Sequence, residues 1–306
     1  MKITPIGFGA WALGGGDWAY SWGPQDDQES IDAIYRAIDS GINWIDTAAG
    51  YGLGHSEEVI GKALTGMKNR PYVFTKCSLT WNDQGEIIDS LKRASIRKEC
   101  EDSLRRLKLE QIDLYQIHWP RPDEDLEEGW AAMAELQREG KVRWIGVSNF
   151  SISQVERINK IAPVNCMQPP YSLVKPDVQD EILPYCAEHN IGVISYSPMF
   201  SGLLTGKMTE ERILNLPPDD WRQHDPEFTQ PRLQRNLDLV KILTEIGERH
   251  GVEPGVVAIA WVLRNPAVTG AIVGMRRPDQ VDGVYPAATF RLSTEEAERL
   301  DNFISS

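Results

Sequence analysis

The sequence predicts an α/β protein in which eight parallel strands and their helices close into one (β/α)8 TIM barrel spanning residues 1–306. Short apolar, β-branched or aromatic runs recur along the chain, and each is followed by a longer segment in which apolar residues have helical spacing. This alternation is typical of parallel strands joined by crossover helices, and eight is the number of strands in such a barrel. Because no polar linker divides the chain, we expect a single domain.

The predicted strands are short and rich in Ile, Val and aromatic residues. In order, they are residues 3–8, 43–46, 72–76, 112–118, 142–147, 164–168, 192–196 and 268–273. The predicted helices carry apolar residues three and four positions apart, with charged residues on the opposite face. They are residues 27–40, 56–64, 93–107, 126–139, 153–160, 178–189, 231–250 and 254–264. Residues 201–230 are long, polar and proline-rich, which favours a functional loop that covers a bound ligand.

The segment after the first predicted strand suggests a competing architecture. Gly7-Phe-Gly9-Ala-Trp-Ala12 resembles the dinucleotide fingerprint of a doubly wound sheet, which should open a helix. Residues 14–16 are all glycine and Pro24 follows, so we interpret the segment as a loop. Its aromatic residues either form a surface plug or one wall of a pocket: Trp18, Tyr20 and Trp22.

Composition excludes several classes of partner. A formal net charge of -13 leaves no basic face for nucleic acid or an anionic membrane surface, although local arginines can still hold a small anion. The four cysteines are widely spaced and the amino terminus contains no signal-like apolar run, so we expect reduced thiols and a cytoplasmic protein. No metal is expected, because the histidines lack the spacing of metal ligands.

Polar residues stand at the carboxyl end of nearly every predicted strand. In a (β/α) barrel these ends converge on one face, where the active site is built. Taken singly, Asp46 is compatible with a helix cap, Lys76 with a satisfied strand-end cation and His118 with a half-buried imidazole. Together with Tyr51, which follows Asp46 in a loop rich in glycine and alanine, they form a set suited to proton transfer.

Carbonyl reduction needs a group that releases a proton near neutral pH, and a free tyrosine, with a pKa of about 10, is too weak an acid. A neighbouring ammonium group favours tyrosinate and lowers the pKa. We therefore expect Lys76 to lower the pKa of Tyr51, Asp46 to hold Lys76 in place, and His118 to orient the carbonyl oxygen by a hydrogen bond.

Several ordered motifs resemble the aldo-keto reductase superfamily, most closely bacterial members related to the potassium-channel β-subunits. The motifs extend over most of the chain and include Ile45-Asp-Thr-Ala-Ala-Gly-Tyr51, Thr75-Lys76, Asp113-Leu-Tyr-Gln-Ile-His118, Gly146-Val-Ser-Asn-Phe150, Tyr196-Ser-Pro and Gly202-Leu-Leu-Thr-Gly-Lys207. The resemblance implies that Tyr51 donates the proton, Lys76 and Asp46 tune it, and His118 orients a small carbonyl substrate. It also implies a nicotinamide cofactor.

The resemblance further implies which residues contact that cofactor. By this resemblance, the nicotinamide carboxamide is held by Ser148, Asn149 and Gln168, and the nicotinamide ring stacks on Tyr196. Those expected to cover the diphosphate are Ser197, Met199, Gly202 and Lys207. The segment after the eighth strand would hold the phosphate end through Gly274, Arg276, Arg277 and Gln280.

The two adjacent arginines suit a 2′-phosphate, because a guanidinium binds phosphate in a bidentate way, so NADPH is favoured over NADH. The alternative is that Arg276 and Arg277 are solvated residues at a helix start. Met275 stands where the family usually has a small or hydroxyl residue, and Gly283-Val284 replace its usual adenine-contacting pair. The chain also begins almost at the first strand, so we expect it to lack the family's amino-terminal hairpin at the barrel bottom.

Three tryptophans near strand ends are candidate walls of the substrate pocket, or else pack the barrel rim: Trp22, Trp81 and Trp119. The resulting prediction is an NADPH-dependent reductase of aldehydes or ketones, acting as a monomer or weak homo-oligomer. Three alternatives stay open: a slowly turning-over NADP-binding regulatory module, a Schiff-base aldolase that uses Lys76, and a purely structural barrel.

Overall fold

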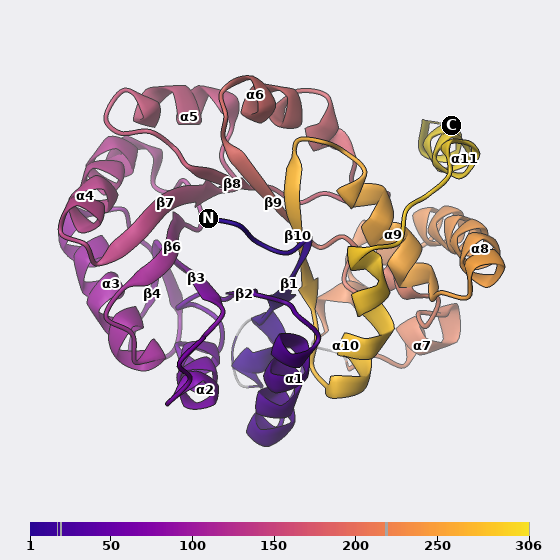
Figure 1. Cartoon of the computed structure of the whole chain (residues 1–306), viewed down its shortest axis with the longest axis horizontal. Coiled ribbons are helices and arrows are strands. Elements are labelled where there is room, and N and C mark those ends of the chain that lie inside the picture. The colour runs from indigo at the N-terminus through magenta and orange to yellow at the C-terminus, as the bar shows by residue number, and fades with distance from the viewer. Residues whose placement is uncertain (17, 19, 218–219, 306) are drawn as a thin grey trace.

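The computed structural model describes residues 1–16, 18, 20–217 and 220–305. It confirms the predicted fold class, because eight parallel strands form a closed barrel in the order β1-β10-β9-β8-β7-β6-β3-β2 (Figure 1). The barrel strands are β1 (Ile6–Gly9), β2 (Trp44–Asp46), β3 (Tyr72–Cys77), β6 (Ile112–Ile117), β7 (Val142–Ser148), β8 (Cys166–Gln168), β9 (Gly192–Tyr196) and β10 (Val268–Gly274).

The helices surround the barrel (Figure 1). They are α1 (Asp27–Asp39), α2 (His55–Leu64), α3 (Arg93–Leu107), α4 (Leu126–Arg138), α5 (Ile152–Asn159), α6 (Ile182–Glu188), α7 (Glu210–Leu214), α8 (Arg232–His250), α9 (Pro254–Leu263), α10 (Pro278–Val284) and α11 (Thr294–Ser305). Side chains cap the amino ends of some helices. Asp26 caps α1 by accepting a hydrogen bond from the Glu29 amide, and Ser151 and Gln154 form a capping box at the start of α5. The prediction omits α7, α10 and α11. No described helix is long and apolar enough to span a membrane.

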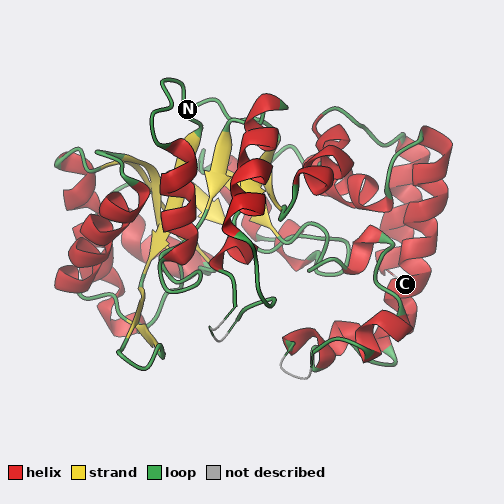
Figure 2. Ribbon diagram, turned by 90° about the horizontal axis from the view of Figure 1, so that it is seen from below, coloured by secondary structure: helices red, strands yellow, loops and turns green. Residues whose placement is uncertain are grey.

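A two-stranded antiparallel hairpin, β4 (Leu79–Trp81) and β5 (Ile87–Asp89), follows β3 and is absent from the prediction. Oδ1 of Asn82 accepts hydrogen bonds from the Gln84 and Glu86 amides, both at 3.0 Å, and so fixes the turn. The hairpin projects from the same end of the barrel as the first loop and the segment 201–230 (Figure 2). Insertions at this end are therefore positioned to shape a site.

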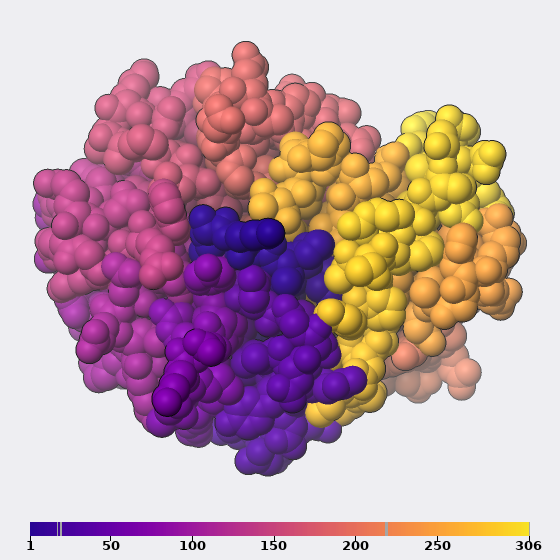
Figure 3. All heavy atoms as spheres, viewed as in Figure 1, coloured from indigo at the N-terminus to yellow at the C-terminus, as the bar shows by residue number. Residues whose placement is uncertain are grey.

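The Trp44 indole closes the other end of the barrel. A Cβ atom added to Gly7 would lie 2.2 Å from this ring, and one added to Gly270 would lie 2.9 Å from it. Gly7 of the first strand thus makes room for an indole, and the strand enters a closed barrel and not the doubly wound sheet of a nucleotide fingerprint. Residues 1–5 form no hairpin; instead, the backbone oxygen of Thr4 accepts a hydrogen bond from Trp44 Nε1 at 2.9 Å. These indigo residues cross the centre of this face (Figure 3).

The segment 201–230 is more ordered than the predicted loop. It contains α7 and several 3-10 turns, although residues 218 and 219 lie outside the described part. Its apolar side chains form a small core of their own with the start of α8: Leu203, Met208, Ile213, Phe228 and Leu233. The apolar residues among its prolines therefore anchor the segment to the start of α8.

Candidate active site

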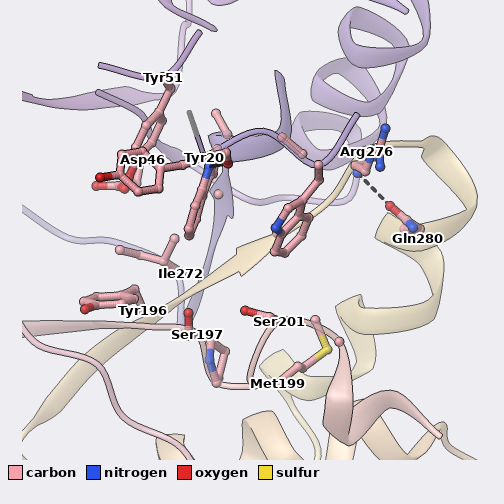
Figure 4. Close-up of a pocket in the computed structure, with 18 of the residues that line it drawn as sticks. Tyr20, Asp46, Tyr51, Tyr196, Ser197, Met199, Ser201, Ile272, Arg276 and Gln280 are labelled. Carbon is pink, nitrogen blue, oxygen red and sulfur yellow. Dashed lines mark hydrogen bonds between the residues drawn. The ribbon is translucent and has the colours of Figure 1, made fainter. Parts of the chain in front are cut away.

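A cavity of about 730 Å³ lies at the carboxyl ends of the barrel strands. Strand-end residues that line it include Gly9, Asp46, Ser148, Gln168, Tyr196 and Gly274. Tyr51 and Asp46 lie at one end of the cavity, and Arg276, bonded to Gln280, lies at the other (Figure 4). The barrel geometry thus gathers the predicted polar residues, as its topology requires.

Asp46, Lys76 and Tyr51 form a chain of contacts at the inner end of the cavity. The ammonium group of Lys76 donates to Asp46 Oδ1 at 2.6 Å, to the Thr47 backbone oxygen at 2.8 Å and to the Tyr51 hydroxyl at 3.3 Å. The Lys76 side chain is 0% exposed and that of Asp46 is 3% exposed. The predicted pairing is therefore present, with the cation behind the tyrosine and out of the cavity.

The ion pair fixes the charge of the lysine. Burial alone would lower the pKa of Lys76, but Asp46 and Tyr51 outweigh it and raise the pKa above its ordinary value. The structure therefore favours an ammonium ion with all three protons engaged, which argues against the free amine that a Schiff-base aldolase requires.

The pKa of Tyr51 moves against the prediction. Burial raises it above its ordinary value of 10.0, and the ammonium group of Lys76 lowers it only in part. The sequence shows the cation but not how far the phenol is removed from water, and desolvation is the larger effect here. Tyr51 is therefore held in its protonated form.

His118 faces the same cavity from the end of β6, and its ring lies edge-on to Tyr51 with centroids 5.7 Å apart. Burial, followed by the charges of Lys76 and Arg121, holds the pKa of its imidazole well below the ordinary value. The ring is thus neutral at pH 7 and carries one N–H group. That ring makes no hydrogen bond to any residue within 1–16, 18, 20–217 and 220–305, which leaves it available to a ligand.

The three predicted carboxamide-binding residues line the cavity, but they are bonded to protein groups. Gln168 donates from Nε2 to Asp46 Oδ2 at 2.9 Å and to Gln116 Oε1 at 3.3 Å. The Ser148 hydroxyl donates to the Gln168 backbone oxygen at 2.8 Å. Asn149, which has a left-handed φ of 63°, accepts a hydrogen bond from the Tyr196 hydroxyl at 2.8 Å. Fully buried Gln116, which the prediction omits, belongs to this network.

The residues expected to cover the diphosphate also line the cavity: Ser197, Met199, Gly202 and Lys207. Ser197 and Met199 directly precede the segment 201–230 (Figure 4), and the other two belong to it. Two arginines of that segment, absent from the prediction, join them. Arg212 donates to the Lys207 backbone oxygen at 3.1 Å, and Arg222 lies over the Trp22 ring at 5.1 Å. Arg222 is also paired with Asp220 at 2.6 Å, so, among the described residues, the unpaired positive charge here comes from Lys207 and Arg212.

Both predicted phosphate-binding arginines line the far end and already have partners. Arg276 donates from Nε to Gln25 Oε1 at 2.6 Å, and Arg277 forms an ion pair with Asp279 at 3.0 Å. Gln280 accepts from the Arg276 amide at 2.7 Å. Met275 is fully buried away from the cavity, whereas Gly283 and Val284 line it.

The predicted aromatic walls are only partly right. Trp22 and Trp119 line the cavity, but Trp81 does not, because its indole packs against the Arg106 guanidinium of α3 at 5.7 Å. Trp11 lines the cavity and stacks on Tyr51 with centroids 6.1 Å apart. The prediction names Trp18, Tyr20 and Trp22 of this loop as a possible pocket wall but omits Trp11, although Trp11 stands close after the first strand, where loops line the site. Other lining residues absent from the prediction are Leu79, Ile87 and Arg121.

The described residues contain no group of three His, Cys, Asp or Glu side chains placed to hold a metal ion. All four cysteines are buried and free.

Comparison with known proteins agrees with this geometry. The sequence model of the Aldo/keto reductase family matches residues 5–305. The chain is 38% identical to the aldo-keto reductase YhdN of Bacillus subtilis (strain 168), covering 100% of this chain and 91% of that protein. It is 31% identical to the NADH-specific methylglyoxal reductase of Escherichia coli (strain K12), covering 97% and 93%.

Among solved structures, the glycerol dehydrogenase AKR11B4 from Gluconobacter oxydans superposes with a TM-score of 0.90 at 39% identity, covering 99% of this chain and 92% of that one. Matches of this length include the whole barrel and the loops that line the cavity. The chain therefore belongs to the aldo/keto reductase family, whose members are oxidoreductases that bind a nicotinamide cofactor and act on small carbonyl compounds.

Proposed function

We propose that this protein reduces aldehydes or ketones to alcohols with NADPH, and that Tyr51 is the proton donor. The observation that carries the proposal is the buried contact chain from Asp46 through Lys76 to the Tyr51 hydroxyl, which reaches the cavity beside the free His118 ring. A phenol next to a fixed ammonium ion can lose its proton to a developing alkoxide, because the cation stabilises the tyrosinate that remains.

The cavity suits a nicotinamide dinucleotide. It extends from Tyr51 to the two arginines of β10–α10, and it is lined along its length by the twelve residues proposed to contact that cofactor. We assign the carboxamide and ring contacts to Ser148, Asn149, Gln168 and Tyr196, the diphosphate contacts to Ser197, Met199, Gly202 and Lys207, and the phosphate end to Gly274, Arg276, Arg277 and Gln280. When bound, the cofactor supplies a hydride to the carbonyl carbon.

The chain's own groups then act on the carbonyl oxygen. The neutral His118 ring donates a hydrogen bond that orients this oxygen, and Tyr51 transfers its phenolic proton to it. Lys76, held by Asp46, stabilises the tyrosinate until solvent returns the proton. The aromatic wall formed by Trp11, Trp22 and Trp119 limits access of water to the reacting atoms. We also propose that the segment 201–230 covers the diphosphate.

The choice of NADPH rests on Arg276 and Arg277, which can bind a 2′-phosphate with their guanidinium groups. The NADH specificity stated for the Escherichia coli relative makes a direct comparison of the two cofactors necessary. The test measures oxidation of NADPH and NADH with a panel of aldehydes and ketones, for the wild type, Tyr51→Phe and Tyr20→Phe.

Tyr20 is a matched control, because it lines the same cavity but makes no contact with Lys76. We expect Tyr51→Phe to lower kcat by about 10²- to 10⁴-fold while NADPH binding is retained, and Tyr20→Phe to keep most of the activity. Equal rates for Tyr51→Phe and the wild type would reject the assignment of the proton donor. NADPH binding by the wild type without turnover of any carbonyl would favour a regulatory module instead.

A further inference from the structure

Arg121 is a positively charged side chain in the wall of the cavity close to the reacting groups. It follows the end of β6 and lines the cavity together with His118 and Trp119. Its guanidinium lies over the Trp119 ring at 5.0 Å, and that ring stacks against His118 with centroids 6.3 Å apart. A ligand that contacts His118 can therefore reach Arg121 with a chain of a few atoms. The influence of Arg121 on the pKa of His118 agrees with this proximity.

The guanidinium of Arg121 differs from those of the other arginines in the cavity wall. Each of the others donates at least one hydrogen bond to a protein group: Arg212, Arg222, Arg276 and Arg277. Arg121 donates none from its side chain to any described residue. Its five N–H groups are thus available to a ligand, apart from one ion pair with Asp89.

The one ion pair that Arg121 forms in the described part of the chain is weak. Nη2 lies 3.4 Å from Asp89 Oδ1 on β5, and the two side chains are 57% and 35% exposed. Exposed pairs of this kind stabilise a protein by about 0–1 kcal/mol. A ligand carboxylate can therefore displace Asp89 at little cost, whereas Arg277 would have to give up a closer pair with Asp279.

The surroundings of Arg121 strengthen its attraction for an anion. Leu79 and Ile87 of the hairpin line the same cavity and give it an apolar surface for the rest of the substrate. Contact with the Trp119 ring restricts the guanidinium, which lowers the cost of ordering it in a complex. In a protein with a net charge of -13, a cation in this position also offsets the general repulsion of anionic substrates.

We propose that Arg121 is a specificity-determining residue that binds an anionic group, above all a carboxylate, carried a few atoms from the substrate carbonyl. The preferred substrates are then aldehydes or ketones that bear a carboxylate. This inference rests on the proposed reductase function and adds the charge of the substrate to it. Asp89 weakens binding of the substrate carboxylate, because it competes for Arg121 and repels that carboxylate.

The test compares two aldehydes of similar size and different charge, 4-carboxybenzaldehyde and its neutral methyl ester, with NADPH. The measured quantity is the ratio of kcat/KM for the acid to that for the ester, in the wild type, Arg121→Gln, Arg121→Lys and Asp89→Asn. Arg299→Gln removes the same charge on α11, outside the cavity, and controls for the change in net charge.

We expect Arg121→Gln to lower the acid-to-ester ratio by about ten- to a hundredfold, because it removes a charge-assisted hydrogen bond. Arg121→Lys should lower it less, Asp89→Asn should raise it severalfold, and Arg299→Gln should leave it unchanged. Added salt should lower the ratio of the wild type but have little effect on that of Arg121→Gln.

Two failures can be told apart. If the wild type reduces the ester and the acid-to-ester ratio changes with neither the Arg121 nor the Asp89 substitutions, Arg121 does not recognise the carboxylate, and the reductase function stands. If the wild type reduces neither aldehyde nor any other carbonyl of the panel, the reductase function is wrong, and the inference fails with it.

Discussion

The ammonium group of Lys76 lies 2.6 Å from the carboxylate of Asp46, and both side chains are shielded from water inside the barrel. Removal of one charge from a buried pair leaves the other without compensation, which costs more than the pair itself contributes. The stability of the barrel and the properties of Tyr51, the proposed proton donor, therefore depend on the same contact.

We expect Lys76→Met to lower the free energy of unfolding by about 3–5 kcal/mol, because the Asp46 carboxylate stays buried without its cation. Asp46→Asn combined with Lys76→Met should recover much of this loss, since the amide introduced by Asp46→Asn is neutral and its oxygen can still accept from Gln168. Urea denaturation followed by circular dichroism measures the free energy of unfolding of both variants. A double variant less stable than Lys76→Met would show that the pair is not the source of the effect.

The rate of reduction should be nearly independent of pH from about pH 6.5 to about pH 9. Tyr51 must be protonated to donate, and burial, opposed in part by Lys76, raises its pKa above 10.0, so activity falls only above that value. His118, whose pKa lies well below 6.5, adds no step in this range. The measurement is kcat/KM against pH at saturating NADPH. A decline centred near about pH 8 would show that Lys76 outweighs burial once the cofactor is bound.

Glu99 on α3 makes the fold sensitive to pH away from the cavity. The residue is 6% exposed, Oε2 has no hydrogen-bond partner among the described atoms, and burial raises the pKa from 4.5 to about 7. Because the folded state binds this proton more tightly than the unfolded state, stability is full below about pH 4.5 and is lost as the pH rises to about 7.

We expect Glu99→Gln to be more stable than the wild type at pH 8, by up to about 3 kcal/mol, and similar to it at pH 4.5. Urea denaturation at both values of pH tests this, with the low-pH pair as the internal control. An equal difference between the two proteins at both values would mean that the Glu99 carboxyl does not titrate as described.

The proposed preference for NADPH should respond to substitution of Asp279. This carboxylate occupies the Arg277 guanidinium, so Asp279→Asn frees it for a 2′-phosphate. We expect Asp279→Asn to raise the ratio of kcat/KM for NADPH to that for NADH severalfold, and Arg277→Ala to lower it by about tenfold or more. If neither variant changes the ratio, the 2′-phosphate does not meet Arg277.

The barrel and its strand-end residues can be predicted because the hydrophobic period of each element and the polar residue at each strand end are visible in short stretches of the sequence. Asp46, His118 and Gln168 stand directly at strand ends, and a parallel barrel must bring those ends together. The hydrogen-bond partners of these side chains cannot be predicted in the same way. Gln168, whose amide the family resemblance assigns to a cofactor, here donates to Asp46 and Gln116, and only the three-dimensional packing places those groups within reach.

The errors have similar causes. The hairpin β4–β5 is two strands of three residues each, too short for a clear period in a polar stretch, so Leu79 and Ile87 escape notice. The pKa of Tyr51 depends on how much water reaches the phenol, which no residue pattern reports. The segment from Gly7 is not such an error, because residues 14–16 and Pro24 already favour a loop; the sequence does not show, however, that Trp44 occupies the space beside Gly7.

The indoles around Tyr51 also give the protein an optical signal. Four of its ten tryptophans line the cavity, namely Trp11, Trp18, Trp22 and Trp119. Reduced nicotinamides absorb light at the wavelengths at which tryptophan emits, so a dinucleotide in this cavity quenches fluorescence from several donors at once. Occupancy can then be titrated in the native chain without a label, and the affinity of a variant that no longer turns over can be measured directly.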